Sequence, residues 1–302
     1  MELKSDMLVK DFLTFWLTFV VKNTMSKATA STYQYKITKH VMPNFGDNLR
    51  LSTMNNIDIQ NIVCKLGESG LSDSSIRSIY DAFHKALGYA ASIGIINQST
   101  LSNIVVPKPS PYQAYICTPI EINKIMDVAV GTMLEIPIAI GCMTGMRRSE
   151  ILGLMWSDYN ESTNLIAVYK SLSNPKTNEF SNGKSSYRAV PVTKPLAELL
   201  NSWKERQEKI LMKKGINHGK YTFICTNNMG KAYEPSYFSN LFKKFLKENN
   251  LPNIRFHDLR HSYINNAIHD SNGNKSIKEI SIEVGHSSAT LTLDYYTRYQ
   301  CS

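Results

Sequence analysis

Cysteine is scarce in this chain of 302 residues. The five cysteines, Cys64, Cys117, Cys142, Cys225 and Cys301, are an odd number and include no Cys-x-x-Cys pair. Such a pattern encodes neither a disulfide framework nor a zinc site. We therefore expect a reducing, cytoplasmic environment for this protein.

Long hydrophobic runs are also missing. The run from Phe12 to Val21 is interrupted by Thr14 and Thr18 and ends at Lys22, well short of the roughly 20 apolar residues that span a bilayer. The sequence predicts neither a transmembrane segment nor a secretory signal, so we expect no membrane partner.

Several motifs of well-known enzyme classes are absent. The sequence has no glycine-rich phosphate loop, no His-Glu-x-x-His pair and no Gly-x-Ser-x-Gly turn. These absences exclude several nucleotide-dependent, zinc-protease and hydrolase classes, because each of those chemistries depends on its motif.

The chain does have an excess of positive charge and enough apolar residues for a core. It carries 34 Lys and Arg against 25 Asp and Glu, a net charge of +9, and 42% of its residues are hydrophobic. The apolar content excludes disorder as the dominant state. The basic surplus favours binding to a nucleic-acid backbone, although an ordinary solvated surface would give the same count.

The first hundred residues read as a helical bundle. Apolar residues recur at helical spacing over Val9–Val21, Ala30–Val41, Ile57–Leu66 and Ser74–Ile93. Three prolines follow in the sequence VVPKPSPY at 105–112, which favours an extended linker. The length suggests two domains. We place the first domain at 1–107, the linker at 108–116 and the second domain at 117–302.

The second domain is predicted to be mainly helical with a small β-sheet. Helices are expected from Pro119 and over Met133–Cys142. Segments rich in β-branched or aromatic residues predict strands at Leu165–Ser171, Ser186–Val192 and Tyr221–Cys225.

Residues suited to phosphate chemistry occur at three separated places. They are Arg147 in TGMRRSE, His257 and Arg260 in HDLRHS, and His286 in VGHSS, which Tyr295 and Tyr296 follow. Each alone is weak evidence, because an arginine at a helix start is usually solvated or ion-paired. Together they suit attack on a phosphodiester: arginine forks bind phosphate oxygens, and a tyrosine hydroxyl can form a covalent phosphotyrosine.

In these motifs the sequence resembles the tyrosine recombinase family of phage-type integrases. TGMRRSEILGLMWSD looks like its first arginine box, FHDLRHSYI like its His-x-x-Arg box, and VGHSSATLTLDYYTR like its histidine and nucleophile boxes. The resemblance covers nearly the whole chain. It implies a SAM-like, helical core-binding domain that binds DNA, followed by a mixed α/β catalytic domain.

The resemblance also assigns roles to residues. Arg147 and Arg260 become the phosphate clamp. His257 and His286 become hydrogen-bond donors to the scissile phosphate, and His257 is also a candidate acceptor of the tyrosine proton. Glu150, one helical turn after Arg147, is expected to orient the site.

Two adjacent tyrosines compete for the role of nucleophile. Helical geometry points Tyr295 and Tyr296 about 100° apart, so only one can face the phosphate. The family pattern Thr-Leu-Asp-x-Tyr favours Tyr296, ten residues after His286. A spacing of nine, which other members use, would select Tyr295.

The family also uses a lysine in a β-hairpin to protonate the leaving 5′ oxygen. Lys176 lies in a Pro-Lys-Thr sequence like the family signature, whereas Lys184 lies closer to the returning strand. We prefer Lys176. The hairpin that contains both lysines is several residues longer than usual for the family, so Lys184 stays an alternative.

The resemblance implies a site-specific recombinase that forms a 3′-phosphotyrosyl link without metal or cofactor. Its expected partners are double-stranded DNA core sites and an excisionase or host DNA-bending factor. We expect the protein to be a monomer when free in solution and a homotetramer in synapsis. We expect it to integrate or excise a mobile element. The alternatives are chromosome dimer resolution of the Xer type, a non-cleaving DNA-binding regulator and a type IB topoisomerase.

Both ends of the sequence depart from larger integrases. The core-binding helices begin almost at Met1, so we expect no arm-binding domain before them. Only six residues follow Tyr296, too few for a long C-terminal docking helix.

The choice of nucleophile predicts the outcome of a matched pair of substitutions. Tyr296→Phe should abolish covalent attachment to DNA and leave DNA binding nearly unchanged, because it removes one oxygen. Tyr295→Phe is the control and should still form the adduct, measured by gel shift under denaturing conditions. The reverse result would move the nucleophile by one residue.

Overall fold

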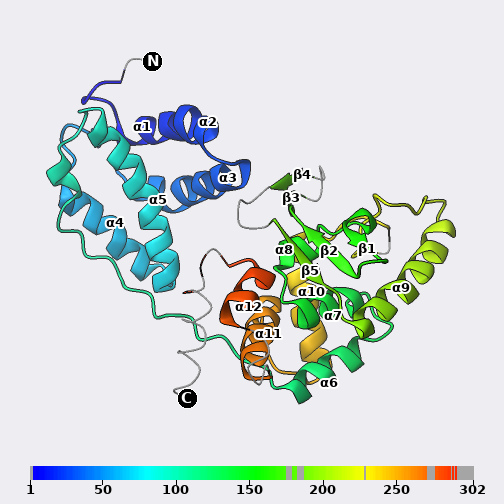
Figure 1. The fold of residues 1–302 in the computed structure, drawn as a ribbon. Coiled ribbons are helices and arrows are strands. Elements are labelled where there is room, and N and C mark those ends of the chain that lie inside the picture. Colours follow the sequence, from blue (N-terminus) through cyan, green and yellow to red (C-terminus); the bar gives the residue numbers. More distant parts are fainter. Residues whose placement is uncertain are drawn as a thin grey trace. The chain divides into compact units, whose positions relative to one another are not determined.

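The computed structural model describes residues 3–174, 179–181, 187–227, 229–270, 276–286, 288 and 290. The chain divides into two compact units, Met1–Tyr112 and Gln113–Ser302 (Figure 1). The domain limits drawn from the sequence, 107 and 117, stay predictions.

The first unit is helical, as its apolar spacing predicts. Its helices are α1 (Val9–Phe15), α2 (Lys22–Thr24), α3 (Lys27–Lys36), α4 (Asn56–Glu68) and α5 (Asp73–Ser92). π-Helical turns at Trp16–Val21 and Ile37–Val41 continue α1 and α3. The side chain of Ser72 accepts a hydrogen bond from the amide of Ser75 and so begins α5.

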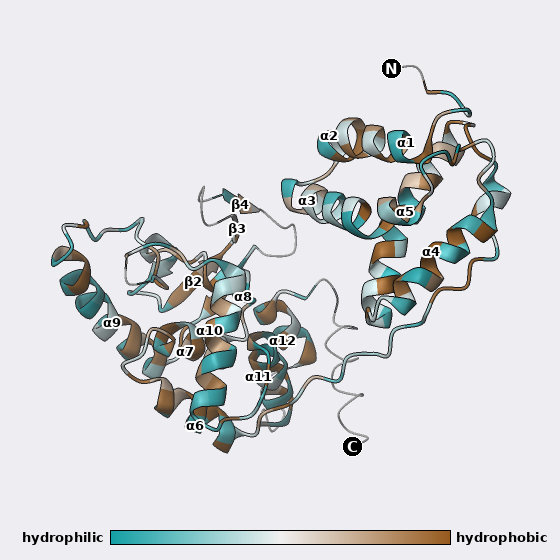
Figure 2. Ribbon diagram, turned by 180° about the vertical axis from the view of Figure 1, so that it is seen from behind, coloured by the Kyte–Doolittle hydropathy of each residue, from teal (hydrophilic) through white to brown (hydrophobic). Residues whose placement is uncertain are grey.

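The apolar faces of these helices meet in one core. Trp16, Phe12, Phe83 and Leu87 are almost fully buried there. In Figure 2, α4 shows alternating hydrophobic and hydrophilic stripes, which is the pattern of a helix with one face in a core.

The second unit combines helices with two small antiparallel sheets. Its helices are α6 (Pro119–Ala129), α7 (Glu135–Thr144), α8 (Arg148–Ile151), α9 (Lys194–Met212), α10 (Pro235–Glu248), α11 (Phe256–Asp270) and α12 (Ile277–Val284). Its strands are β1 (Tyr159–Asn160), β2 (Leu165–Val168), β3 (Ser171–Asn174), β4 (Glu179–Ser181) and β5 (Arg188–Pro191). One sheet has the order β1-β2-β5 and the other pairs β3 with β4. The predicted class, mainly α with a small sheet, is confirmed.

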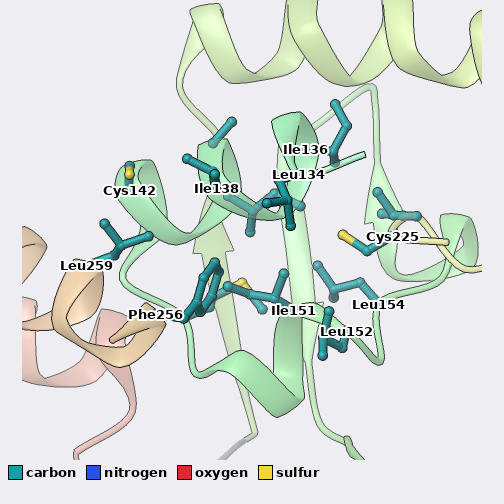
Figure 3. Close-up of a cluster of buried hydrophobic side chains, with 14 of the residues drawn as sticks. Leu134, Ile136, Ile138, Cys142, Ile151, Leu152, Leu154, Cys225, Phe256 and Leu259 are labelled. Carbon is teal, nitrogen blue, oxygen red and sulfur yellow. The ribbon is translucent and has the colours of Figure 1, made fainter. Parts of the chain in front are cut away.

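Helix α7 forms the centre of the second core. Every one of its residues except Met143 is buried, including Ile136, Ile138 and Ile140. Figure 3 shows α7 side chains beside Phe256 and Leu259 of α11. A helix buried on every side is rigidly held, so the segments that follow α7 begin from a fixed point.

One strand prediction was wrong. Tyr221–Cys225 forms no strand beyond an isolated bridge between Phe223 and Met155. The amide side chain of Gln207 in α9 donates to the carbonyls of Phe223 at 3.0 Å and Ile224 at 3.2 Å. Among the described residues, backbone pairing is thus limited to the short contact with residues 154–156, and a buried side chain satisfies the carbonyls of Phe223 and Ile224.

Among the helices of the described residues, none is long and apolar enough to cross a membrane.

Gly145, which ends α7, is predicted to tolerate no larger residue. Its φ is +60°, and a Cβ there would lie 2.4 Å from Cδ1 of Tyr263. Gly145→Ala should therefore lower the free energy of unfolding by about 2 kcal/mol or more.

The matched control for this test is Gly219→Ala in the same unit, where no atom lies within 4 Å of the new Cβ. It should change stability by about 0.5 kcal/mol at most. Urea denaturation of both variants measures the difference, and equal stability would contradict the packing argument.

Candidate active site

Arg147 lies at the start of α8, three residues after α7 ends. Its amide donates to Oε2 of Glu150 at 2.8 Å, and its Nη1 donates to Oε1 at 3.0 Å. The Arg147 side chain keeps 33% of its surface exposed. The side chain is therefore held by the Glu150 carboxylate and still reaches the surface.

Arg260 comes from α11 and reaches the same place. Its side chain is buried, and Nη1 donates to the carbonyl of Gly145 at 2.7 Å. This contact joins the two predicted arginine boxes, because Gly145 lies two residues before Arg147. The position of Arg260 follows from the packing of α11 on α7.

His257 lies one turn before Arg260 on α11. Its ring meets the ring of His261 edge to face, with centroids 4.9 Å apart. Partial burial, followed by the charges of His261, Arg260 and Arg255, lowers the pKa of His257 from 6.5 to about 4. His257 is therefore neutral at pH 7.

His286 follows α12 and completes the cluster. Nη2 of Arg147 donates to the carbonyl of Gly285 at 2.6 Å, directly before His286. Burial first, and then the charges of Arg260, Arg147, His261 and His257, lower the pKa of His286 from 6.5 to about 4. The structure thus brings together the four predicted residues from three separate motifs.

Glu150 has a second arginine partner that the sequence analysis did not name. Nη1 and Nη2 of Arg188 donate to the two carboxylate oxygens of Glu150 at 3.1 and 2.8 Å. Burial alone would raise the pKa of Glu150, but the hydrogen bonds and charge of Arg188, and then those of Arg147, hold it below its usual value.

A signal for Arg188 was present in the sequence. Successive side chains of a strand alternate between its faces. In the predicted strand Ser186–Val192, Arg188 therefore shares a face with Val190 and Val192, and all three are buried in the structure. A charge on an apolar strand face indicates a buried ion pair.

A cleft of about 470 Å³ opens beside Arg147 and Arg148, the two arginines of the TGMRRSE motif. It is lined by Arg147, Arg148, Ser149, Ser239, Arg255, Phe256 and His257. Arg148 donates to the hydroxyl of Ser239 from α10. The concentration of cationic and hydroxyl groups suits an anionic ligand such as a phosphate.

The remaining predicted site residues cannot be placed in this geometry. Lys176, Lys184, Tyr295 and Tyr296 lie outside the described residues. The hairpin lysine and the nucleophile therefore stay predictions from the sequence.

Comparison with family models decides the class. Residues 117–301 match the model of the phage integrase family, and residues 8–67 match that of the phage integrase N-terminal SAM-like domain. The chain belongs to the phage integrase family. The predicted enzyme class, a tyrosine-type recombinase that cleaves and rejoins DNA, is confirmed.

Two curated relatives align with most of this recombinase. The ICEBs1 integrase of Bacillus subtilis is 28% identical over 87% of this chain and 72% of its own length. A XerC-like tyrosine recombinase of Caldanaerobacter subterraneus is 24% identical over 97% of this chain and 79% of its own.

Solved structures of integrases have the same fold. The Tn1549 transposon integrase in complex with a circular intermediate DNA has a TM-score of 0.76 at 18% identity, over 96% of this chain and 95% of that one. A lambda integrase tetramer bound to a Holliday junction has a TM-score of 0.71 at 17% identity, over 96% and 77%.

The two lowered histidine pKa values predict separate responses to single arginine substitutions. Arg147→Gln should raise the pKa of His286 and leave that of His257 unchanged, because the Arg147 charge acts on His286. Arg255→Gln should raise the pKa of His257 and leave His286 unchanged. Imidazole NMR titration of the DNA-free protein measures both values.

The same shifts fix the sign of a stability change. A histidine whose folded pKa is depressed binds fewer protons when folded than when unfolded, so the fold loses stability as pH falls from about 6.5 toward about 4. A pKa near 6.5 for both histidines would contradict the site geometry described above.

Proposed function

We propose that this recombinase integrates and excises a mobile genetic element through a 3′-phosphotyrosyl intermediate. The observation that carries the proposal is the meeting of Arg147, Arg260, His257 and His286, each from a recombinase motif, in one positively charged place. The ICEBs1 and Tn1549 integrases, which this chain resembles, support the mobile-element role.

The two arginines hold the scissile phosphate in this mechanism. The Arg147 side chain keeps 33% of its surface exposed, and Arg260 is buried. Both remain charged at every relevant pH, so they neutralise the charge that gathers on the five-coordinate phosphorus. His286 donates a hydrogen bond to a phosphate oxygen.

The covalent step follows from these positions. The hydroxyl oxygen of Tyr296 attacks the phosphorus, and its proton passes to the ring of His257, which is neutral and can accept it. The bond from phosphorus to the 5′ oxygen breaks, and this oxygen takes a proton from Lys176. Attack by a 5′ hydroxyl of the partner DNA reverses the step and releases the tyrosine.

The proposed partners follow from strand exchange between two DNA sites. Each site needs two cleaving copies, so the protein is a tetramer on two synapsed core sites. Free in solution, it is a monomer. The lambda integrase tetramer bound to a Holliday junction supports this assembly. An excisionase or a host DNA-bending factor sets direction, and the reaction occurs on the nucleoid in the cytoplasm.

Chromosome dimer resolution is the second candidate function. The XerC-like relative, which aligns with 97% of this chain, favours it. The two functions differ in the DNA that is recombined, because a dimer resolvase acts on a chromosomal site and an integrase acts on the ends of its own element.

The test is recombination of defined DNA by the purified protein. Duplexes that carry the junctions of the element around this gene should be cut and joined, and shuffled duplexes of the same composition should not. Arg260→Gln should slow cleavage by about 10²- to 10³-fold, because it removes a charge that stabilises the transition state.

Three outcomes would overturn the proposal in different ways. Binding without a covalent adduct would indicate a DNA-binding regulator. Relaxation of any supercoiled plasmid without joining of sites would indicate a topoisomerase. Joining of a chromosomal site in place of element ends would indicate dimer resolution.

A further inference from the structure

Arg188 lies outside every recombinase motif named above, yet it is buried beside the site. Its side chain is 4% exposed and that of Glu150 is 2% exposed. The pair is bidentate, so both oxygens of Glu150 accept from Arg188 and from Arg147 at once. Glu150 therefore links strand β5 to the start of α8.

The same arginine reaches a third segment. Nε of Arg188 donates to the carbonyl of Glu283 at 2.6 Å, and Nη2 of Arg147 donates to the carbonyl of Gly285 at 2.6 Å. Both carbonyls lie at the C-terminal end of α12, directly before His286. Two guanidinium groups bridged by one carboxylate thus hold the chain that leads to His286.

Helix α12 depends on these contacts for its placement. Its buried residues Ile280 and Val284 form a small cluster with Ile264 of α11, separate from the main core of the unit. Tyr263 of α11 donates to the carboxylate of Glu283 at 3.2 Å. With a small apolar anchor, a helix end is positioned by its polar contacts.

We propose that Arg188 is a positioning residue of the cleavage centre, which aims Arg147 through Glu150 and seats the end of α12 so that His286 enters the site. The inference rests on the proposed function for its effect on cleavage. In the mechanism proposed above, Arg147 and His286 contact the phosphate, and Arg188 has no step of its own. It acts by holding two groups that do.

The geometry explains why arginine is needed at position 188. Its planar fork serves both oxygens of Glu150 while Nε remains free to reach the Glu283 carbonyl. A lysine ammonium can balance the charge of Glu150, but one nitrogen cannot take all three positions. A neutral side chain leaves Glu150 with Arg147 as its one remaining charged partner among the described contacts.

The test compares Arg188→Met and Arg188→Lys with a matched control. Arg206→Met removes the same kind of residue from another ion pair of the unit, in which Arg206 donates to buried Glu135 from 3.1 Å. Single-turnover cleavage of a nicked suicide duplex carrying the element junction is measured at saturating protein. Differences in DNA affinity then do not affect the measured rate of cleavage.

Arg188→Met should slow cleavage by about 10²-fold and Arg188→Lys by about tenfold, because a clamp displaced by about 1 Å loses rate on this scale. Arg206→Met should cleave within about threefold of the parent. If Arg188→Met does not fold, Arg188→Lys decides. Cleavage by Arg188→Lys at the parental rate would overturn the proposal, and so would equal losses in Arg188→Met and Arg206→Met.

A second readout needs no DNA and separates this inference from the proposed function. Release of α12 should move the imidazole NMR signals of His286 in Arg188→Lys and leave them in place in Arg206→Met. Unchanged His286 signals in Arg188→Lys would overturn the positioning role, whether or not the parent cleaves DNA. A parent that forms no adduct while the His286 signals move would count against the proposed function alone.

Discussion

The site depends on the two ion pairs that the Glu150 carboxylate forms, one with Arg147 and one with Arg188. Buried charges are costly unless they are paired and fully hydrogen-bonded, and here both oxygens of Glu150 have partners. The three charges join segments that are distant in sequence, and two of them also hold the end of α12. The charges of Arg147, Arg188 and Glu150 sum to one net positive charge, and Arg147 lines the cleft.

Burial and the surrounding positive charges together determine the protonation state of the two histidines. Burial first, and then the charges of the nearby arginines and histidines, lower the pKa of His257 and of His286 to about 4, so both rings are neutral at pH 7. A neutral ring can accept a proton at one nitrogen and donate at the other, which suits both proposed roles. An entering phosphate would offset the positive surroundings, so the site is arranged for an anion before one binds.

The apolar helix α7 supplies the rigid base for this arrangement. Because α7 is buried on every side, its end at Gly145 is fixed in space. Gly145 adopts a left-handed conformation, packs against Tyr263 and offers its carbonyl to Arg260. A packing constraint at one glycine thus sets the distance between the two arginine motifs.

The sequence by itself determined the family and the mainly helical class, and it named four residues that the structure brings together, because helical spacing and short motifs are local patterns. It missed Arg188 and wrongly assigned a strand to Tyr221–Cys225. Both errors have the same physical cause. Alternation in a strand marks Arg188 as buried without naming Glu150, and β-propensity cannot show that Gln207 takes the backbone bonds of Phe223. Partners that are distant along the chain are chosen only when the tertiary structure brings them together.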